Sequence, residues 1–266
     1  NKRLKRNEAG NFKRHIVMIA SIFHRGKEYK TDFFNPIDIS LPLHTGADCV
    51  SAWYVKPMQI EPVRMGDWVG DVNQGGSVNV RNITFNPHGN GTHTECVGHI
   101  SKEFITINQC LKRFMFVAEL VTILPEQLDN GDFVISKRAL ELTLAENKPE
   151  AIVIRCLTNS PSKIKAQYSN TNPPYITAEA MQFLCDKGVE HLLFDMPSVD
   201  KEVDGGVLAS HHIFWQYPHN TQLQKTITEM IYVPNDVYDG TYILNIQIAS
   251  FENDASPSKP VLYKVI

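Results

Sequence analysis

Residues 176–200 limit the fold of this 266-residue chain more than any other segment. In the first half, ITAEAMQFLCDKG, apolar residues recur at intervals of three and four, which predicts a helix with Thr177 as its N-cap and Gly188 as its stop. In the second half, VEHLLFDMPSVD, a continuous apolar run predicts a strand buried on both faces. A helix that leads directly into such a strand is typical of α/β proteins.

The polar turn at the end of this strand marks a candidate site. It contains Asp195, Ser198 and Asp200. Because α/β sheets bind ligands beyond the carboxyl ends of their strands, we expect these side chains to point toward a site, with Ser198 donating a hydrogen bond to substrate or water. A serine after Pro197 is equally expected from turn chemistry alone.

The rest of the chain mixes strands and helices. ISKRALELTL, after Asp132, also has helical spacing, and a strand from about 226 to 233 follows a helix or turn around His211 that Pro218 interrupts. Further segments with strand composition lie at 18–23, which opens a hairpin, and at 114–122, 151–156 and 242–248. Since no repeat and no Gly/Ser-rich linker occurs, we predict one mixed α and β domain over residues 18–266.

The first 17 residues differ in charge from the rest. Six lysines and arginines against one glutamate fall within residues 1–14, without an apolar stretch of signal-peptide length. We interpret residues 1–17 as a solvated basic tail or a non-native extension rather than a nucleic-acid-binding arm. The formal net charge of -3 also argues against nucleic acid as a partner.

Cysteine usage and hydropathy indicate the environment. The five cysteines are an odd number without a CxxC pair, which argues against a disulfide framework and against a thiolate zinc site. A reducing compartment, the cytoplasm, is the simple interpretation. No window approaches the roughly 18 apolar residues that a membrane-spanning helix needs, so no membrane partner is expected.

Three histidines fall within the twelve residues HGNGTHTECVGH, 88–99. His93 and Glu95, two apart in an extended segment, project to one side and suit zinc, manganese or iron. The glycines between His88 and His93 allow the backbone to bend so that His88 joins the same side. His99 is a further ligand or a proton shuttle. The alternative is a glycine-rich turn whose imidazoles face water.

A metal in this segment needs ligands from elsewhere in the chain. The sequence alone leaves the choice open among the later histidines and carboxylates, which are His191, His211, His212, His219, Asp195, Asp200, Asp204 and Glu229.

Four segments resemble one known family. GTHTECVGH is similar to the HxGTHxDxPxH signature of the metal-dependent cyclase family, which includes bacterial kynurenine formamidases and isatin hydrolases. IDISLPL (37–43) resembles the family's opening D-[IL]-S-x-P-L, AIVIRC (151–156) its A-[IL]-[IL]-[IL]-R-T strand, and FDMPSVD (194–200) its D-x-P-S-[VI]-D turn. All four occur in the family's order, which an accidental match would not produce.

The resemblance implies an α/β fold of the swivelling β/β/α type, with a mixed β core and flanking helices, assembled as a homodimer or homotetramer. It also implies one or two zinc or manganese ions per chain. By motif position, His93 is a metal ligand, Glu95 the carboxylate that bridges two ions, and His99 the proton donor and acceptor. ASHHIFW resembles A-H-x-x-L-L and places His211 as a later ligand, and ITEMI resembles I-x-E-N-[LI] and places Glu229 as another.

The chain departs from the family pattern at three points. Gly89 occupies the position of the first motif histidine, so His88 serves as a ligand only if a bulge or looser turn absorbs one extra residue. Glu95 replaces the motif aspartate, and Val97 replaces the proline. The interval between the two later ligands is longer than in the formamidases, which indicates a different pocket wall.

The chemistry implied by the resemblance is hydrolysis of a non-peptide C–N amide bond by metal-activated water. The substrate is an aryl formamide such as N-formylkynurenine, or a cyclic amide such as isatin. Candidates for an aromatic pocket wall are Trp53, Tyr54, Trp68, Phe85 and Trp215. The alternatives are a cyclase- or lactonase-type reaction on another carbonyl, and a non-catalytic binding protein with the same fold. Retention of five metal-ligating or acid–base side chains argues against the last.

Overall fold

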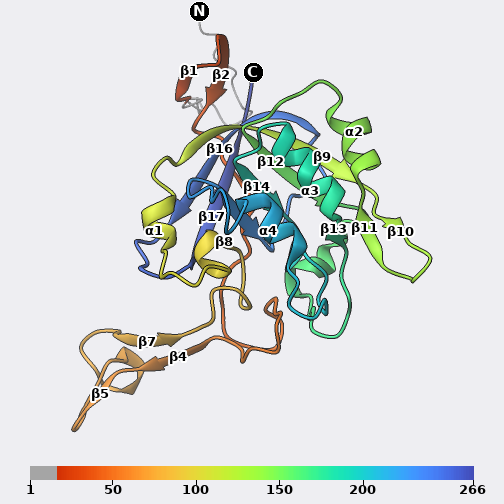
Figure 1. The fold of residues 1–266 in the computed structure, drawn as a ribbon. Coiled ribbons are helices and arrows are strands. Elements are labelled where there is room, and N and C mark those ends of the chain that lie inside the picture. The colour runs from red at the N-terminus through yellow and green to blue at the C-terminus, as the bar shows by residue number, and fades with distance from the viewer. Residues whose placement is uncertain (1–16) are drawn as a thin grey trace, which may run out of the picture.

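Seven strands form a closed mixed β-barrel in the computed structural model, which describes residues 17–266 (Figure 1). Strands β9, β12, β14 and β15 are parallel to one another, and the other three are antiparallel to their neighbours. In barrel order the strands are β16 (Gly240–Ile248), β9 (Met115–Ile123), β12 (Ala151–Cys156), β14 (His191–Phe194), β15 (Thr226–Glu229), β8 (His93–Glu95) and β17 (Ala255–Lys264). Pairing of β17 with β16 closes the barrel, and β3 (Ile37–Asp38) pairs with the other edge of β17.

The barrel wall is buried on both faces. In β12, Ala151 and Val153 belong to the apolar cluster inside the barrel, whereas Ile152 and Ile154 belong to the cluster beneath the helices. Successive side chains of a strand point to opposite faces, so a wall covered on both sides needs an unbroken apolar run. The run AIVIRC supplies this, and for that reason its sequence indicates a buried strand.

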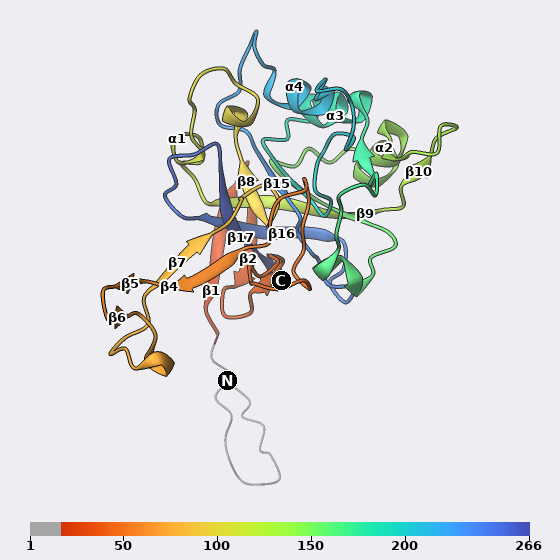
Figure 2. The same ribbon diagram turned by 90° about the horizontal axis from the view of Figure 1, so that it is seen from below.

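Three helices cover the outer face of the parallel strands (Figure 1, Figure 2). They are α2 (Lys137–Leu144), α3 (Ala178–Asp186) and α4 (Ala209–Trp215). The predicted N-cap of α3 is confirmed, because Thr177 Oγ1 accepts from the backbone N–H of Ala180 at 3.2 Å. Gly188 follows the helix end with a positive φ of 84°. The predicted α/β class, with a mixed β core and flanking helices, is confirmed.

Smaller elements surround the barrel. Figure 1 shows an arm of paired strands that extends away from the barrel, formed by β4 and β7 with β5 and β6 beyond them. The predicted opening hairpin is confirmed as β1 and β2. The bounds are β1 (Ile19–His24), β2 (Lys27–Asp32), β4 (Gln59–Pro62), β5 (Arg64–Met65), β6 (Trp68–Val69), β7 (Arg81–Thr84), β10 (Glu126–Gln127), β11 (Phe133–Ile135), β13 (Tyr175–Ile176) and the single-turn α1 (Ile107–Cys110).

Two strands differ from the sequence prediction. The strand expected over 226–233 begins at Thr226 but ends at Glu229, because Met230 adopts a positive φ of 51° and turns the chain out of the sheet. Strand β17 was not predicted, since prolines at 257 and 260 argue against a central strand. Its pairing with β8, β16 and β3 outweighs this local preference.

All five cysteines lie in the described part of the chain and are free thiols. Over residues 17–266, none of the helices combines the length and the apolar composition needed to cross a bilayer. The predicted basic tail lies outside the described residues, apart from Val17.

Helix α2 offers a test of the outer core. Leu140 is fully buried, whereas Leu142 on the same helix is 75% exposed. Replacement of Leu140 by Ala leaves a cavity, so we expect the free energy of unfolding to fall by about 2–5 kcal/mol, against about 0.5 kcal/mol or less for Leu142→Ala. Urea denaturation of both variants measures the difference. Equal losses of unfolding free energy in the two variants would contradict the burial of Leu140.

Candidate metal centre

The site is built where β8 pairs antiparallel with β15 at the carboxyl end of the parallel strands. Residues His93 and Glu95 lie on one face of β8, and Glu229 is the residue of β15 that pairs with His93. Helix α4 adds His211, which is 2% exposed. The antiparallel register therefore brings together side chains more than 100 positions apart in the chain.

The carboxylate of Glu95 is the centre of this cluster. Its Oε2 atom lies 3.2 Å from His88 Nδ1, 4.0 Å from His93 Nε2 and 3.8 Å from His99 Nδ1. Its Oε1 atom lies 3.1 Å from His211 Nε2. Three imidazoles thus surround Oε2 and one faces Oε1, so both oxygens of this carboxylate contact histidines.

Glu229 lies on the far side of the same cluster. One of its carboxylate oxygens is 3.5 Å from His93 Nε2, and the other is 4.0 Å from His211 Nε2. The backbone N–H of Val199 donates to Glu229 at 3.0 Å and fixes the carboxylate. This contact comes from the turn after β14, so the polar turn singled out in the sequence orients a candidate ligand.

Hydrogen bonds hold the ring nitrogens of two histidines in a defined orientation. His93 Nδ1 lies 3.1 Å from the carbonyl oxygen of Gly91, and His211 Nδ1 lies 2.6 Å from Asp200 Oδ2. In each case Nδ1–H donates to this oxygen, and Nε2 is directed into the cluster. Asp200 was a candidate ligand in the sequence, but it lies behind His211 and orients it.

The donor set fits a divalent metal ion. His93 Nε2 and Glu95 Oε2 are buried without a hydrogen-bond partner among the described residues. Buried polar atoms without partners cost free energy, and imidazole nitrogen with carboxylate oxygen is a donor set that zinc and manganese accept. Three groups have donor atoms within 4.8 Å of one another, namely His88, His93 and Glu95; Glu95, His99 and His211; and His88, His99 and Asp254.

Neighbouring charges shift the pKa values of the carboxylates and histidines in this cluster. Burial raises the pKa of Glu95, but the imidazoles of His99, His211 and His88 outweigh this and hold it well below the usual value. Burial and the neighbouring charge of Glu95 raise the pKa of Glu229. Burial lowers the pKa of His88, but the carboxylates of Asp254 and Glu95 outweigh this and raise it to about 10. Burial likewise lowers the pKa of His211, and Asp200 and Glu95 raise it to about 10.

The extra residue between His88 and His93 is taken up by a turn. The backbone N–H groups of Gly89 and Asn90 both donate to the Asn86 carbonyl, at 3.4 and 3.1 Å. A Cβ atom at Gly89 would lie 2.4 Å from a Val55 methyl group, so only glycine allows this close approach. The displaced His88 thereby reaches Glu95.

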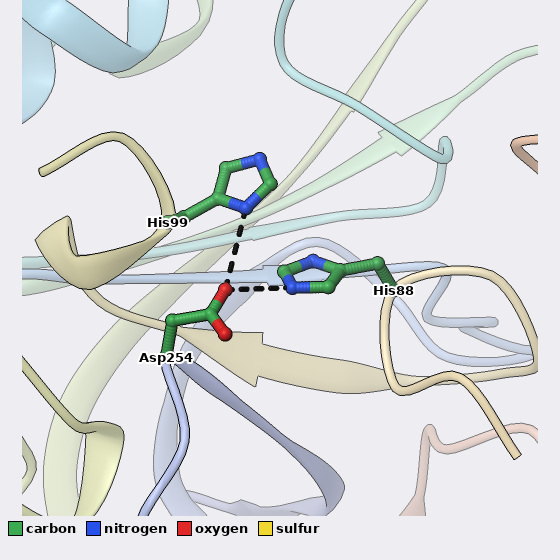
Figure 3. A group of neighbouring side chains, drawn as sticks. All are labelled: His88, His99 and Asp254. Carbon is green, nitrogen blue, oxygen red and sulfur yellow. Dashed lines mark hydrogen bonds and ion pairs between the residues drawn. The ribbon is translucent and has the colours of Figure 1, made fainter. Parts of the chain in front are cut away.

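Asp254 is a member of the cluster that the sequence analysis did not find. It directly precedes β17, and one of its oxygens contacts both His88 and His99 (Figure 3). No motif surrounds it, and it lies 159 positions after Glu95 in the sequence. Only the pairing of β17 with β8 places it here.

A cavity of about 430 Å³ opens onto the cluster. Its lining includes both residues predicted to bind substrate, Trp53 and Ser198. Ser198 Oγ also accepts from the Asp200 N–H, which is the turn contact expected as the alternative. The lining residues are Trp53, Val55, Asn86, His88, His99, Ser198, Leu208, His211 and Glu229.

The other aromatic candidates do not line this cavity. Trp215 is fully buried in the core beneath the helices, Trp68 lies on β6 in the arm, and Phe85 packs edge-on against Phe251. Tyr54 is 63% exposed and hydrogen-bonds to Glu202.

The remaining ligand candidates lie outside the cluster. His191 Nδ1 lies 2.9 Å from Thr226 Oγ1, and His212 Nδ1 lies 3.1 Å from the Tyr217 carbonyl. Asp195 pairs with Lys163. Asp204 accepts hydrogen bonds from backbone N–H groups of its own turn. His219 is exposed on the surface.

The sequence profile of the family described as "Putative cyclase" matches residues 37–201. This chain belongs to the cyclase family. The matched segment extends from β3 to the polar turn after β14 and includes the whole histidine segment, whereas His211 and Glu229 lie beyond it.

Sequence relatives of this cyclase-family chain include kynurenine formamidases of Bacillus species. That of Bacillus cereus is 28% identical over 228 residues, which cover 85% of this chain and 96% of the relative. That of Bacillus cytotoxicus is 28% identical over 190 residues, which cover 71% of this chain and 82% of the relative.

Solved structures share the fold at low sequence identity. A predicted metal-dependent hydrolase from Bacillus stearothermophilus has a TM-score of 0.61 at 16% identity, covering 86% of this chain and 98% of its own. An isatin hydrolase bound to the product analogue thioisatinate has a TM-score of 0.60 at 15% identity, covering 87% and 92%.

The raised pKa values predict a pH dependence of metal binding. Since His88 and His211 keep their protons up to about pH 10 without metal, and a metal ligand must be neutral, binding expels protons. We expect the affinity for Mn²⁺ to rise between pH 6 and 8, by about tenfold per pH unit for each proton expelled. Titration calorimetry at several pH values measures this affinity.

The controls are two histidine variants. His88→Ala should make the Mn²⁺ affinity depend less steeply on pH, and replacement of the exposed His219 by Ala should leave the pH dependence unchanged. Equal Mn²⁺ affinity at pH 6 and pH 8 would contradict the assignment.

Proposed function

We propose that this chain is a metal-dependent hydrolase that cleaves a non-peptide C–N amide bond in an aryl formamide or a cyclic amide. The observation that carries the proposal is the buried carboxylate of Glu95, whose two oxygens contact His88 and His211, and both of these histidines line a cavity. The kynurenine formamidase relatives and the isatin hydrolase fold support the same reaction class.

The ligands divide into two sets that share Glu95. His88, His93 and Glu95 would hold one ion. Glu95, His211 and Glu229 would hold a second, since His211 Nε2 lies 3.1 Å from Glu95 Oε1 and 4.0 Å from Glu229 Oε1. Zinc and manganese both accept these nitrogen and oxygen donors. A divalent ion held there would lower the pKa of water and polarise the scissile carbonyl.

His99 is the acid–base group. It lies at the rim of the cluster, with its side chain 30% exposed and on the cavity wall. Its Nδ1 atom faces Asp254, so Nε2 is free to accept the proton of the attacking water. The hydroxyl joins the acyl carbon, the C–N bond breaks, and Nε2 returns the proton to the leaving nitrogen.

Trp53 and Ser198 give the cavity its selectivity. The indole of Trp53 offers an apolar face against which the aryl ring of a substrate packs. Ser198 Oγ accepts from the Asp200 N–H, so its own proton is available for a hydrogen bond to the substrate.

Two substitutions separate metal binding from proton transfer. Glu95→Gln removes the central carboxylate, so we expect loss of most bound metal and of measurable hydrolysis. His99→Ala should keep the metal and lower kcat by about a hundred- to ten-thousandfold. Elemental analysis and single-turnover assays measure both effects.

The matched control is Glu103→Gln, since Glu103 contacts Ser101 and Tyr217 outside the cluster. Its metal content and rate should equal those of the unmodified chain. A Glu95→Gln protein with full metal content and full rate would exclude the assignment.

Substrate class is tested with three carbonyl compounds. We expect N-formylkynurenine or isatin to be hydrolysed with a kcat/KM at least about tenfold above that of a lactone of similar size, because Trp53 suits an aryl ring. Product formation with Zn²⁺- or Mn²⁺-loaded enzyme measures this. Preference for the lactone would favour the cyclase- or lactonase-type alternative.

A further inference from the structure

Asp254, in the loop that leads into β17, contacts His88 and His99. We infer that Asp254 is a positioning residue whose single carboxylate sets the ring orientation of both His88, a metal ligand, and His99, the acid–base group. This inference rests on the proposed function.

The contacts converge on one oxygen atom. Asp254 Oδ2 lies 2.8 Å from His88 Nε2 and 3.4 Å from His99 Nδ1, as the dashed lines in Figure 3 mark. The two imidazole rings lie side by side, with centroids 4.4 Å apart and planes 33° apart. One carboxylate oxygen therefore hydrogen-bonds to His88 and lies at ion-pair distance from His99, at opposite ends of the histidine segment.

For His88 this contact decides which nitrogen binds metal. An ionised carboxylate only accepts, so the ring must carry its proton on Nε2. The other ring nitrogen, Nδ1, lies 3.2 Å from Glu95 Oε2, so without metal both nitrogens face carboxylates. A metal ion bound at Nδ1 would replace the proton there, while Asp254 keeps the remaining proton on Nε2. Asp254 thereby presents the His88 lone pair to the metal position.

For His99 the same oxygen has the complementary effect. It lies 3.4 Å from Nδ1 and favours the tautomer with the proton on Nδ1, so that Nε2 is left as the acceptor for the proton of water. A carboxylate behind a catalytic imidazole also stabilises the imidazolium that forms when the proton arrives. One residue thus couples metal binding to proton transfer.

The other histidine ligands follow the same pattern. His93 has the Gly91 carbonyl behind its Nδ1, and His211 has Asp200. His88 is displaced by one residue from the family position and lies in a turn, where no acceptor from its own loop contacts its ring nitrogens. Asp254 supplies this acceptor from another part of the chain.

The backbone around Asp254 is fixed on both sides. Its carbonyl accepts from the Cys96 N–H at 3.0 Å, and the Asn253 carbonyl accepts from the Ile107 N–H at 2.8 Å. The next residue, Ala255, pairs with Glu95. Because a Cβ at Gly98 would lie 1.9 Å from the Ile105 carbonyl oxygen and 3.2 Å from Asp254 Cβ, glycine allows the turn before His99 to pack closely.

The test compares Asp254→Ala with the conservative Asp254→Asn. The alanine removes the acceptor, so we expect Zn²⁺ affinity, measured by competition with a chromogenic chelator, to fall about 10- to 100-fold. At saturating Zn²⁺, kcat should fall by a similar factor while KM changes less than about twofold. Asparagine keeps an oxygen acceptor and should restore part of both losses.

A second readout does not depend on metal or activity. In ¹⁵N-labelled, metal-free protein, the hydrogen-bonded Nε2 proton of His88 should be resolved at low field and be lost in Asp254→Ala. Glu252→Gln is the matched control, because it removes a carboxylate of the same loop whose hydrogen bonds are to Thr106 and Asn108, outside the cluster. It should leave every readout unchanged.

The outcomes separate this inference from the proposed function. Unchanged Zn²⁺ affinity, kcat and imidazole signal in Asp254→Ala would overturn the positioning role. Loss of one whole equivalent of Zn²⁺ at saturating metal would instead make Asp254 a ligand, and would also overturn it. If the unmodified chain binds no Zn²⁺, the proposed function fails, and the imidazole signal still decides the role of Asp254.

Discussion

The charge of one buried carboxylate, that of Glu95, determines how the rest of the site is arranged. A carboxylate without solvent is costly unless positive or hydrogen-bonding groups surround it, and here imidazoles contact both of its oxygens. These histidines come from the turn before β8, from β8 itself, from the short 3-10 helix Val97–His99 and from α4, so their convergence requires the complete barrel. The same cluster of donors that stabilises the carboxylate is suited to hold a divalent ion in place of the histidine protons.

Barrel closure places these groups. β8 has only three residues, yet it lies between β15 and β17 and takes its register from both. Strand β15 contributes Glu229 opposite His93, and the residue before β17 contributes Asp254. Because antiparallel pairing fixes which residues face each other, a shift of one position would turn these side chains away from the site.

Much of the fold could be predicted from local patterns. The continuous apolar run AIVIRC and the period of 3.6 residues in the segment that became α3 are both local patterns, which depend on near neighbours in the chain. Strand β17 could not be predicted, since its prolines oppose a strand locally and only its partners outweigh them. The end of β15 was also missed, because the positive φ of Met230 has no signal in residue type.

The sequence by itself determined which residue types were available for the chemistry and, through motif spacing, that His88, His93, Glu95 and His99 belong to one segment. Tertiary structure decided the rest: that His211 rather than His212 faces Glu95, that Asp200 stands behind His211, and that Asp254 joins the cluster. The physical reason is that contacts between residues distant in the chain depend on strand register and helix orientation. These follow from the packing of the whole barrel, which no single segment encodes.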